Sequence, residues 1–166
     1  MHGRAENMKK EKHMSEIREF VIPKEKAVFW MDRNGCWNNE HGKFRHKRII
    51  DYFNSCIQKD ADGYYLTQMN GDVREKVYFP CEDTAFFVTD IVKKDEEIRL
   101  LLNTKEEIPL TPENLSVKND CLYLQNGENL IKFTERAMLK IADCIAYENG
   151  QYRFCNKEGK TEIPRI

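Results

Sequence analysis

The feature that most constrains the fold is an order of local signals that occurs twice along the chain. In each occurrence a hairpin signal leads to a glycine, a helix follows, and a second glycine turn precedes further strands. The step from Cys36 to Gly42 equals the step from Cys121 to Gly127. At an offset of 88 residues the apolar helix positions match one another: Ile50 with Met138, Phe53 with Ile141, Cys56 with Cys144 and Ile57 with Ile145.

A duplicated unit of this kind predicts two similar halves packed against each other. We therefore expect an α+β fold of two repeated strand-helix-strand halves, each a curled, mostly antiparallel sheet packed on one helix. Two copies are too few for a solenoid, which needs at least three repeats. Residues 1–22 are dominated by charge, which predicts a flexible N-terminal extension. The predicted repeats then cover 23–93 and 94–166.

The first half begins with a predicted β-hairpin, in which the mostly apolar stretches 27–32 and 36–38 flank the turn dipeptide Asn34-Gly35. A helix is expected after Gly42, because apolar side chains recur there at helical spacing. Its apolar positions are Ile49, Ile50, Phe53, Cys56 and Ile57, and the polar stretch 59–63 is predicted to end it. Strands are predicted from residue 64 and over 73–79, 85–92 and 98–103.

Composition excludes several classes of function. The chain of 166 residues has 27 basic and 28 acidic side chains, so no net field favours DNA, RNA or an anionic membrane. No apolar run reaches the roughly 20 residues of a membrane span, and residues 1–26 lack the apolar core of a secretory signal. The six cysteines are scattered without a CxxC pair, which is typical of reduced thiols. We expect a cytoplasmic protein without a cofactor.

Several motifs resemble one bacterial family. They are Arg33-Asn34-Gly35-Cys36-Trp37, then residues 44–53 (FRHKRIIDYF), then Asp60-Ala61-Asp62-Gly63-Tyr64-Tyr65-Leu66, then Cys81-Glu82-Asp83-Thr84-Ala85-Phe86. Together with residues 99–104 and 109–110 these stretches are similar to the domain of unknown function 1285, over residue 26 to the C-terminus.

The chain departs from that family's pattern in one motif. Cys81 stands where the family usually has Val, and Ala85 stands where it usually has Pro. The resemblance implies a bacterial origin, a fold with repeated motifs, and a role in ligand binding or signalling. It brings no catalytic residues.

The sharpest candidate site is the basic run over 43–48 at the start of the first helix. A helix N-terminus carries a partial positive charge, so natural helices usually place acids or hydroxyl groups there. The second predicted helix follows that rule with Thr134 and Glu135, whereas the first has Arg45, His46 and Arg48. Cations at this position indicate a bound anion such as a phosphate or carboxylate. The alternative is that they are solvated side chains paired with nearby acids.

Other candidate residues lie on the hairpin before the basic run and ahead of a later strand. Trp30 and Trp37 lie on the preceding hairpin, where they would offer a face to a planar ligand or fill the core. Glu82 and Asp83 precede an apolar strand, where they would act as acid and base, hold a cation, cap a turn, or form salt bridges to Arg45 or Arg48. We include Trp37, Glu82 and Asp83 with the three basic residues as candidate ligand-binding residues.

Motifs of metal and nucleotide chemistry are weak here. Among the scattered Cys and His residues, Cys36, His41, His46 and Cys81 match no zinc spacing, and no cysteine stands out as an activated nucleophile. The Asp60-x-Asp62-Gly63 stretch begins like a calcium loop but lacks the Glu at position twelve. No Walker, GxSxG or HExxH motif occurs.

The sequence thus predicts a non-enzymatic binding or regulatory module that holds a small anionic ligand near the first helix. Two alternatives stay open. One is a protein-interaction or assembly subunit that offers exposed strand edges or an apolar groove to a protein partner or to a second copy. The other is a hydrolase or transferase that uses Glu82, Asp83 and a histidine.

Overall fold

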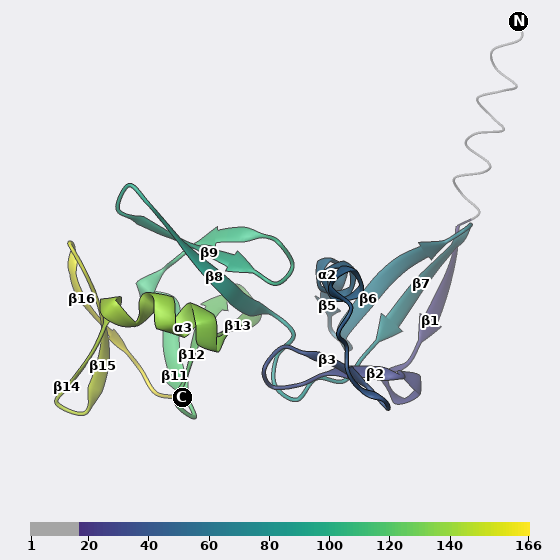
Figure 1. Cartoon of the computed structure of the whole chain (residues 1–166), viewed down its shortest axis with the longest axis horizontal. Helices are drawn as coiled ribbons and strands as arrows, with labels where there is room; N and C mark the ends of the chain where they lie inside the picture. Colours follow the sequence, from purple (N-terminus) through teal and green to yellow (C-terminus); the bar gives the residue numbers. More distant parts are fainter. Residues whose placement is uncertain (1–16) are drawn as a thin grey trace, which may run out of the picture.

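The computed structural model describes residues 17–166, which form two units lying side by side (Figure 1). The first unit runs from β1 to β7 and the second from β8 to β16. Each unit contains one α-helix and two β-sheets. None of the described helices is long and apolar enough to cross a membrane.

The first unit has a four-stranded sheet of order β1-β7-β6-β5 and a three-stranded sheet of order β2-β3-β4. Strand β1 pairs parallel with β7, and the other neighbours are antiparallel. The elements are β1 (Arg18–Ile22), the 3-10 helix η1 (Lys24–Lys26), β2 (Phe29–Met31), β3 (Trp37–Asn39), β4 (Gly42–Lys43), α2 (Lys47–Ser55), β5 (Ile57–Asp60), β6 (Gly63–Asn70) and β7 (Val73–Tyr78).

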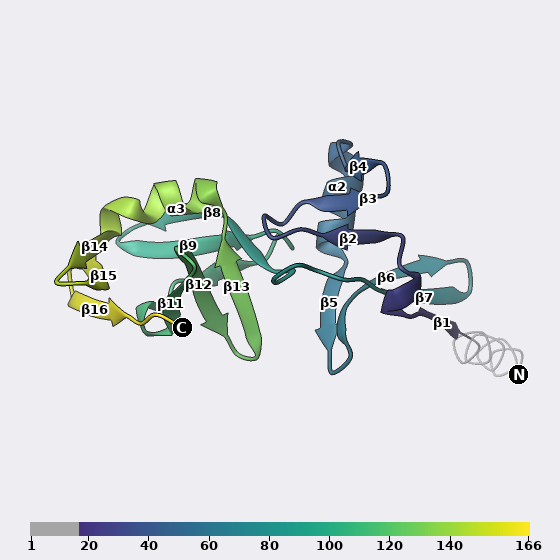
Figure 2. The same ribbon diagram turned by 90° about the horizontal axis from the view of Figure 1, so that it is seen from below.

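The second unit has a six-stranded sheet of order β10-β9-β8-β13-β12-β11 and a three-stranded sheet of order β14-β15-β16. Figure 2 shows α3 along one side of the larger sheet, near β8. The elements are β8 (Phe87–Lys94), β9 (Glu97–Leu102), β10 (Glu107–Pro109), η2 (Pro112–Asn114), β11 (Leu115–Lys118), β12 (Cys121–Asn126), β13 (Asn129–Phe133), α3 (Glu135–Ile141), η3 (Ala142–Cys144), β14 (Ile145–Glu148), β15 (Gln151–Asn156) and β16 (Gly159–Ile163).

The first unit has an aromatic core. Trp37 is buried, and its ring meets Phe53 of α2 edge-on at a centroid distance of 5.4 Å and Phe79 at 4.8 Å. Phe29 joins the same cluster from β2. The core of the second unit is mostly aliphatic and lies between the six-stranded sheet, α3 and the last three strands.

The two units share a packed joint at the start of β8. Phe87 begins that strand of the second unit, yet its ring is buried in the core of the first. It lies against Gly35, where a Cβ atom would come within 3.0 Å of the ring. Gly35 has φ +79°, a left-handed conformation that also favours glycine. The hairpin turn and the joint therefore both require glycine at this position.

A polar cluster reinforces the joint. The ammonium group of Lys132 in β13 donates a 2.8 Å hydrogen bond to the carbonyl oxygen of Arg33 and lies 3.2 Å from the Asp83 carboxylate. The Tyr123 hydroxyl donates to the same carboxylate at 2.5 Å. The Lys132 side chain is only 10% exposed, so the ion pair offsets a desolvation cost that the lysine would otherwise carry.

The structure confirms the predicted α+β class and several predicted elements. These include the hairpin across Asn34-Gly35, the strands over 73–79, 85–92 and 98–103, and the Thr134 cap, which accepts a hydrogen bond from the Ala137 amide. The structure does not show that the two halves repeat each other over their whole length. Both units have a helix followed by a three-stranded antiparallel stretch, but the first unit has no counterpart of the six-stranded sheet.

Three predicted boundaries are wrong. Residues 18–22 form a strand instead of a flexible extension, because β7 offers a parallel pairing partner that local composition does not reveal; residues 1–16 lie outside the described residues. The first helix ends at Ser55, and Ile57 opens a strand, so the polar stretch 59–63 forms a hairpin turn and does not end the helix. The predicted boundary at 93/94 falls inside β8.

Candidate functional site

The start of α2 is shaped by the hairpin that precedes it. Strand β4 pairs with β3, and the amide of Phe44 then donates a 2.9 Å hydrogen bond to the Trp37 carbonyl. The chain turns into the helix at His46, which is extended (φ −80°, ψ 109°) and provides no side-chain cap. The first turn contains no acidic residue. The N-terminal amides of α2 therefore have no capping side chain to compete with an external acceptor.

A hydrogen bond fixes how α2 is rotated about its axis. The indole Nε1 of Trp37 donates to the Asn54 side-chain oxygen at 2.8 Å, and Phe53 packs against the indole ring. This contact turns the apolar side of the helix toward the core. It leaves Arg48, Ile49 and Tyr52 toward the surface, where Ile49 is 45% and Tyr52 51% exposed.

These surface residues line an open groove beside the helix start, with a volume of about 620 Å³. That volume lies within the range typical of small-molecule sites, roughly 300–1,000 Å³. Its walls combine three basic residues with aromatic and aliphatic ones: Asn39, Phe44, Arg45, His46, Arg48, Ile49, Tyr52 and Phe53. We call this the α2 groove.

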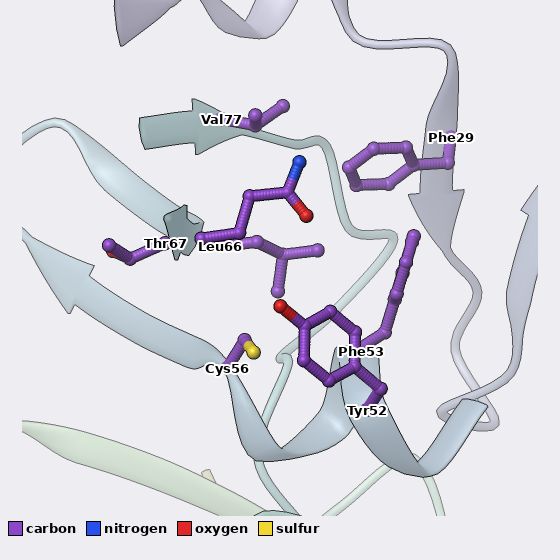
Figure 3. A pocket seen from close by; sticks show the side chains of 8 residues that line it. Phe29, Tyr52, Phe53, Cys56, Leu66, Thr67 and Val77 are labelled. Carbon is purple, nitrogen blue, oxygen red and sulfur yellow. The ribbon is translucent and has the colours of Figure 1, made fainter. Parts of the chain in front are cut away.

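A smaller apolar slot between the helix and the sheet shares two lining residues, Tyr52 and Phe53, with the α2 groove. The slot has a volume of about 50 Å³, and Tyr52 and Phe53 form part of its wall (Figure 3). Its other lining residues come from β2, the end of α2, β6 and β7: Phe29, Cys56, Leu66, Thr67, Gln68 and Val77. The α2 groove, with Arg45, His46 and Arg48 as its basic rim, and the apolar slot thus share the wall that Tyr52 and Phe53 form.

Tyr52 stands at the junction of groove and slot. Figure 3 shows its hydroxyl group directed toward the Cys56 side. The neighbouring Cys56 thiol, followed by partial burial, raises the pKa of the Tyr52 phenol. The phenol is therefore neutral at physiological pH and available as a hydrogen-bond donor at the junction.

The structure brings together three of the six predicted site residues. Arg45, His46 and Arg48 share the α2 groove, and within residues 17–166 none of them forms an ion pair. The nearest acid on the helix, Asp51, lies 3.6 Å from Lys105 instead. The alternative in which Arg45 and Arg48 pair with nearby acids is thus not found in the described part of the chain.

The other three predicted residues lie elsewhere. Trp37 is 1% exposed and belongs to the core, so its indole face is closed to a ligand. Glu82 accepts hydrogen bonds from the Arg33 amide at 3.0 Å and from its guanidinium at 3.4 Å. Asp83 is engaged by Lys132 in the joint. These carboxylates do form structural bridges, but to Arg33 and Lys132 and not to Arg45 or Arg48.

Sequence reasoning missed the apolar slot. Phe29, Leu66 and Val77 come from three strands far apart in the sequence, and each reads as an ordinary core residue. No local pattern distinguishes an apolar residue that lines a slot from one that fills a core. Trp30, the other tryptophan of the hairpin, lines a different hollow together with Val28 and Asn39.

Among the described residues, no three His, Cys, Asp or Glu side chains gather as a metal-ligand group. The fold and the groove together define a two-unit, strand-rich α+β protein with an open basic and apolar groove on its first unit.

Two solved structures share this fold, and both are of DUF1285 family proteins. The protein from Silicibacter pomeroyi DSS-3 has a TM-score of 0.59 and 13% sequence identity, over 87% of this chain and 81% of its own. The protein from Shewanella baltica OS155 has a TM-score of 0.52 and 14% identity, over 72% of this chain and 93% of its own. No protein-family model and no curated protein matches the sequence.

The predicted resemblance to the domain of unknown function 1285 is therefore confirmed at the level of the fold. At 13–14% identity the likeness carries the arrangement of strands and helices, and no site residue is transferred from it.

Proposed function

We propose that the chain is a binding module for a small amphipathic anion, held in the α2 groove. The observation that carries the proposal is that the basic side chains of Arg45, His46 and Arg48 share one groove with Tyr52 and Phe53, which also wall the apolar slot. A ligand with an anionic head and a short apolar tail complements both parts. A regulatory role, in which binding alters what the chain contacts, is consistent with this arrangement.

The head of the ligand would lie at the basic rim. Guanidinium groups bind phosphate and carboxylate oxygens through paired hydrogen bonds, and the uncapped amides at the start of α2 add further donors. Arg45 and Arg48 are exposed, so water and salt weaken each interaction. We therefore expect affinity in the micromolar to millimolar range, which falls as ionic strength rises.

The tail would lie along Tyr52, and only its end would enter the small slot toward Cys56 and Leu66. Burying apolar surface stabilises a complex by roughly 25 cal/mol per Å², so a short alkyl chain adds useful affinity that an inorganic anion lacks. The Tyr52 hydroxyl, at the mouth of the slot, would donate to the linking oxygen between head and tail.

The engagement of Glu82 and Asp83 in structural contacts favours a binding module over a hydrolase or transferase. An acid-base pair must reach a substrate proton, within about 2.6–3.2 Å. Neither carboxylate lines the α2 groove, and Asp83 already interacts with Lys132 and Tyr123.

The test is a titration of the protein with three probes by isothermal calorimetry: octyl phosphate, inorganic phosphate and octanol. The proposal predicts measurable binding of octyl phosphate, at least about tenfold weaker binding of inorganic phosphate, and the weakest binding for octanol, because only octyl phosphate satisfies both rim and slot. Binding of octyl phosphate should weaken in 0.5 M salt. Equal affinity for octyl phosphate and octanol, or no binding of octyl phosphate at millimolar concentration, would contradict it.

A second candidate, a protein-interaction surface, is favoured by the edge strand β1. Its outer edge has no strand partner among residues 17–166, and Phe20 and Val21 are 59% and 48% exposed. Edge strands with exposed apolar side chains can pair with another chain. Sedimentation analysis of the wild type and of Phe20→Glu tests this candidate. A dimer that Phe20→Glu dissociates supports it, and a monomer at all concentrations counts against self-association.

A further inference from the structure

Two cysteines lie at the base of the β14–β15 hairpin. Strands β14 and β15 are antiparallel, with Ile145 opposite Phe154 and Glu148 opposite Gln151. Cys144 directly precedes Ile145, and Cys155 directly follows Phe154. Cys144 is the last residue of η3, so it lies just outside the strand pair, and one further step of the register brings it next to Cys155.

Opposing residues of an antiparallel pair point to the same face and have Cα atoms about 4.5–5.5 Å apart. A disulfide spans Cα separations of about 4.4–6.8 Å, a range that includes the spacing of such opposing residues. Both thiols are free, both side chains are half-buried, and both line the same hollow of the second unit, with a volume of about 620 Å³. Oxidant and reductant therefore have access to the pair from solvent.

The other four cysteines are placed differently. Cys121 lies opposite Lys118 in the β11–β12 pair, and the backbone of Cys81 forms an isolated β-bridge with that of Met31. Cys36 accepts a backbone hydrogen bond from Asp32 across its hairpin, and Cys56 ends α2. Among the cysteines of residues 17–166, Cys144 and Cys155 are the pair that the β14–β15 register brings together.

We propose that Cys144 and Cys155 form a thiol-oxidation site that closes to a reversible intramolecular disulfide. With a hydroperoxide as the two-electron oxidant, one thiolate attacks the peroxide oxygen, which forms a sulfenic acid and releases an alcohol or water. The second thiol sulfur then attacks the sulfenic sulfur, forms the S–S bond and releases water. Two thiols are oxidised and one peroxide is reduced, and a dithiol reductant reverses the change.

Burial and, to a smaller extent, the nearby charges set the rate at which the pair is oxidised. Burial, with smaller contributions from Asp143 and Cys155 opposed by Lys93, raises the pKa of the Cys144 thiol. Little of this thiol is therefore ionised at neutral pH, and thiolate is the reactive form. We expect slow oxidation near pH 7 that accelerates toward pH 9.

The disulfide would close a loop that contains the hairpin β14–β15. Closing such a loop reduces the conformational entropy of the unfolded chain. The oxidised protein should therefore melt on the order of 5 °C higher than the reduced protein.

The test uses the full chain, reduced and then treated with diamide, an azo compound that takes up the two hydrogens of a thiol pair. Free thiols are alkylated, and the digest is analysed by mass spectrometry. We expect the number of free thiols to fall from six to four, with a dithiothreitol-sensitive peptide pair that joins Cys144 to Cys155.

Variants separate this pair from the other thiols. Cys144→Ser and Cys155→Ser should each abolish the loss of two thiols and the gain in melting temperature, whereas Cys121→Ser should retain both effects. Six free thiols in treated wild type, a cross-link between other cysteines, or an unchanged thiol loss in Cys144→Ser would overturn the proposal.

Discussion

The indole of Trp37 donates a 2.8 Å hydrogen bond to Asn54, and this contact connects the hairpin core to α2. It sets the rotation of the helix, and with it the direction in which Arg48 and Tyr52 face the surface. The α2 groove is therefore a consequence of a core contact made by a residue that is itself inaccessible to ligand.

Replacing Asn54 should destabilise the first unit. In Asn54→Leu the Trp37 indole N–H loses its acceptor while it stays buried, which costs about 1–3 kcal/mol. Urea denaturation followed by tryptophan fluorescence measures the change. Ser55→Ala, at an exposed position on the same turn, is the control and should change stability by less than about 0.5 kcal/mol. Equal effects of the two substitutions would contradict the assigned role of Asn54.

Gly35→Ala should destabilise the joint more than a comparable substitution at an open turn. The added methyl group would meet the Phe87 ring at 3.0 Å, in addition to the left-handed strain at φ +79°. Gly71→Ala is the matched control, because Gly71 also has positive φ but its Cβ position is open. Left-handed strain alone costs roughly 1–2 kcal/mol, so the urea midpoint of Gly35→Ala should fall clearly below that of Gly71→Ala. Indistinguishable midpoints would mean that the contact with Phe87 is not tight.

The joint should also depend on the buried ion pair. Asp83→Ala leaves the Lys132 ammonium, in a side chain only 10% exposed, without its carboxylate, and should cost roughly 3 kcal/mol. The neighbouring substitution Glu82→Ala breaks a more exposed pair with Arg33, and should cost about 1 kcal/mol or less. Thermal unfolding of the two variants measures the difference. A larger effect for Glu82→Ala than for Asp83→Ala would contradict this account of the joint.

The contacts of Asp60 should make the stability of the first unit depend on pH in the acid range. Lys76 and Tyr78 donate 2.6 Å hydrogen bonds to Asp60 and lower the pKa of its carboxyl group to about 2. A folded-state pKa below the unfolded value of 3.8 means that this stabilisation is complete above about pH 4 and is lost as the pH falls toward 2.

Melting curves between pH 6 and pH 2 test that dependence. The wild type should lose more stability over this range than Asp60→Asn, which has no carboxyl group to protonate at this position. Parallel pH profiles for the two proteins would show that Asp60 does not contribute in this way.

The sequence predicted those features of the fold and of the site that are determined by local signals. The Asn34-Gly35 turn, the Thr134 cap and the basic run 45–48 are each encoded within a few neighbouring residues, and all three lie where they were expected. Strands β5 and β14 were not anticipated, because Ile57 and Ile145 continue the helical spacing of the apolar residues before them.

The remaining features depend on contacts between distant segments. Strand β1 exists through its pairing with β7, and the slot is lined by residues from β2, α2, β6 and β7. The partner of Asp83 lies on β13, so sequence proximity favoured Arg45 and Arg48 as partners instead. Local composition contains no record of such pairings. This is why the basic residues of the proposed site were predicted and its apolar part was not.

The most direct test of the α2 groove compares the affinity of octyl phosphate for the wild type, Arg45→Ala/Arg48→Ala and Lys47→Ala. Lys47 lies on the same turn of α2 and carries the same charge, but it does not line the groove. If the groove binds the anionic head, the double variant should lose at least about tenfold in affinity, and Lys47→Ala should stay within about twofold of the wild type. An equal loss in both variants would indicate a nonspecific charge effect, and unchanged affinity in the double variant would contradict the proposed site.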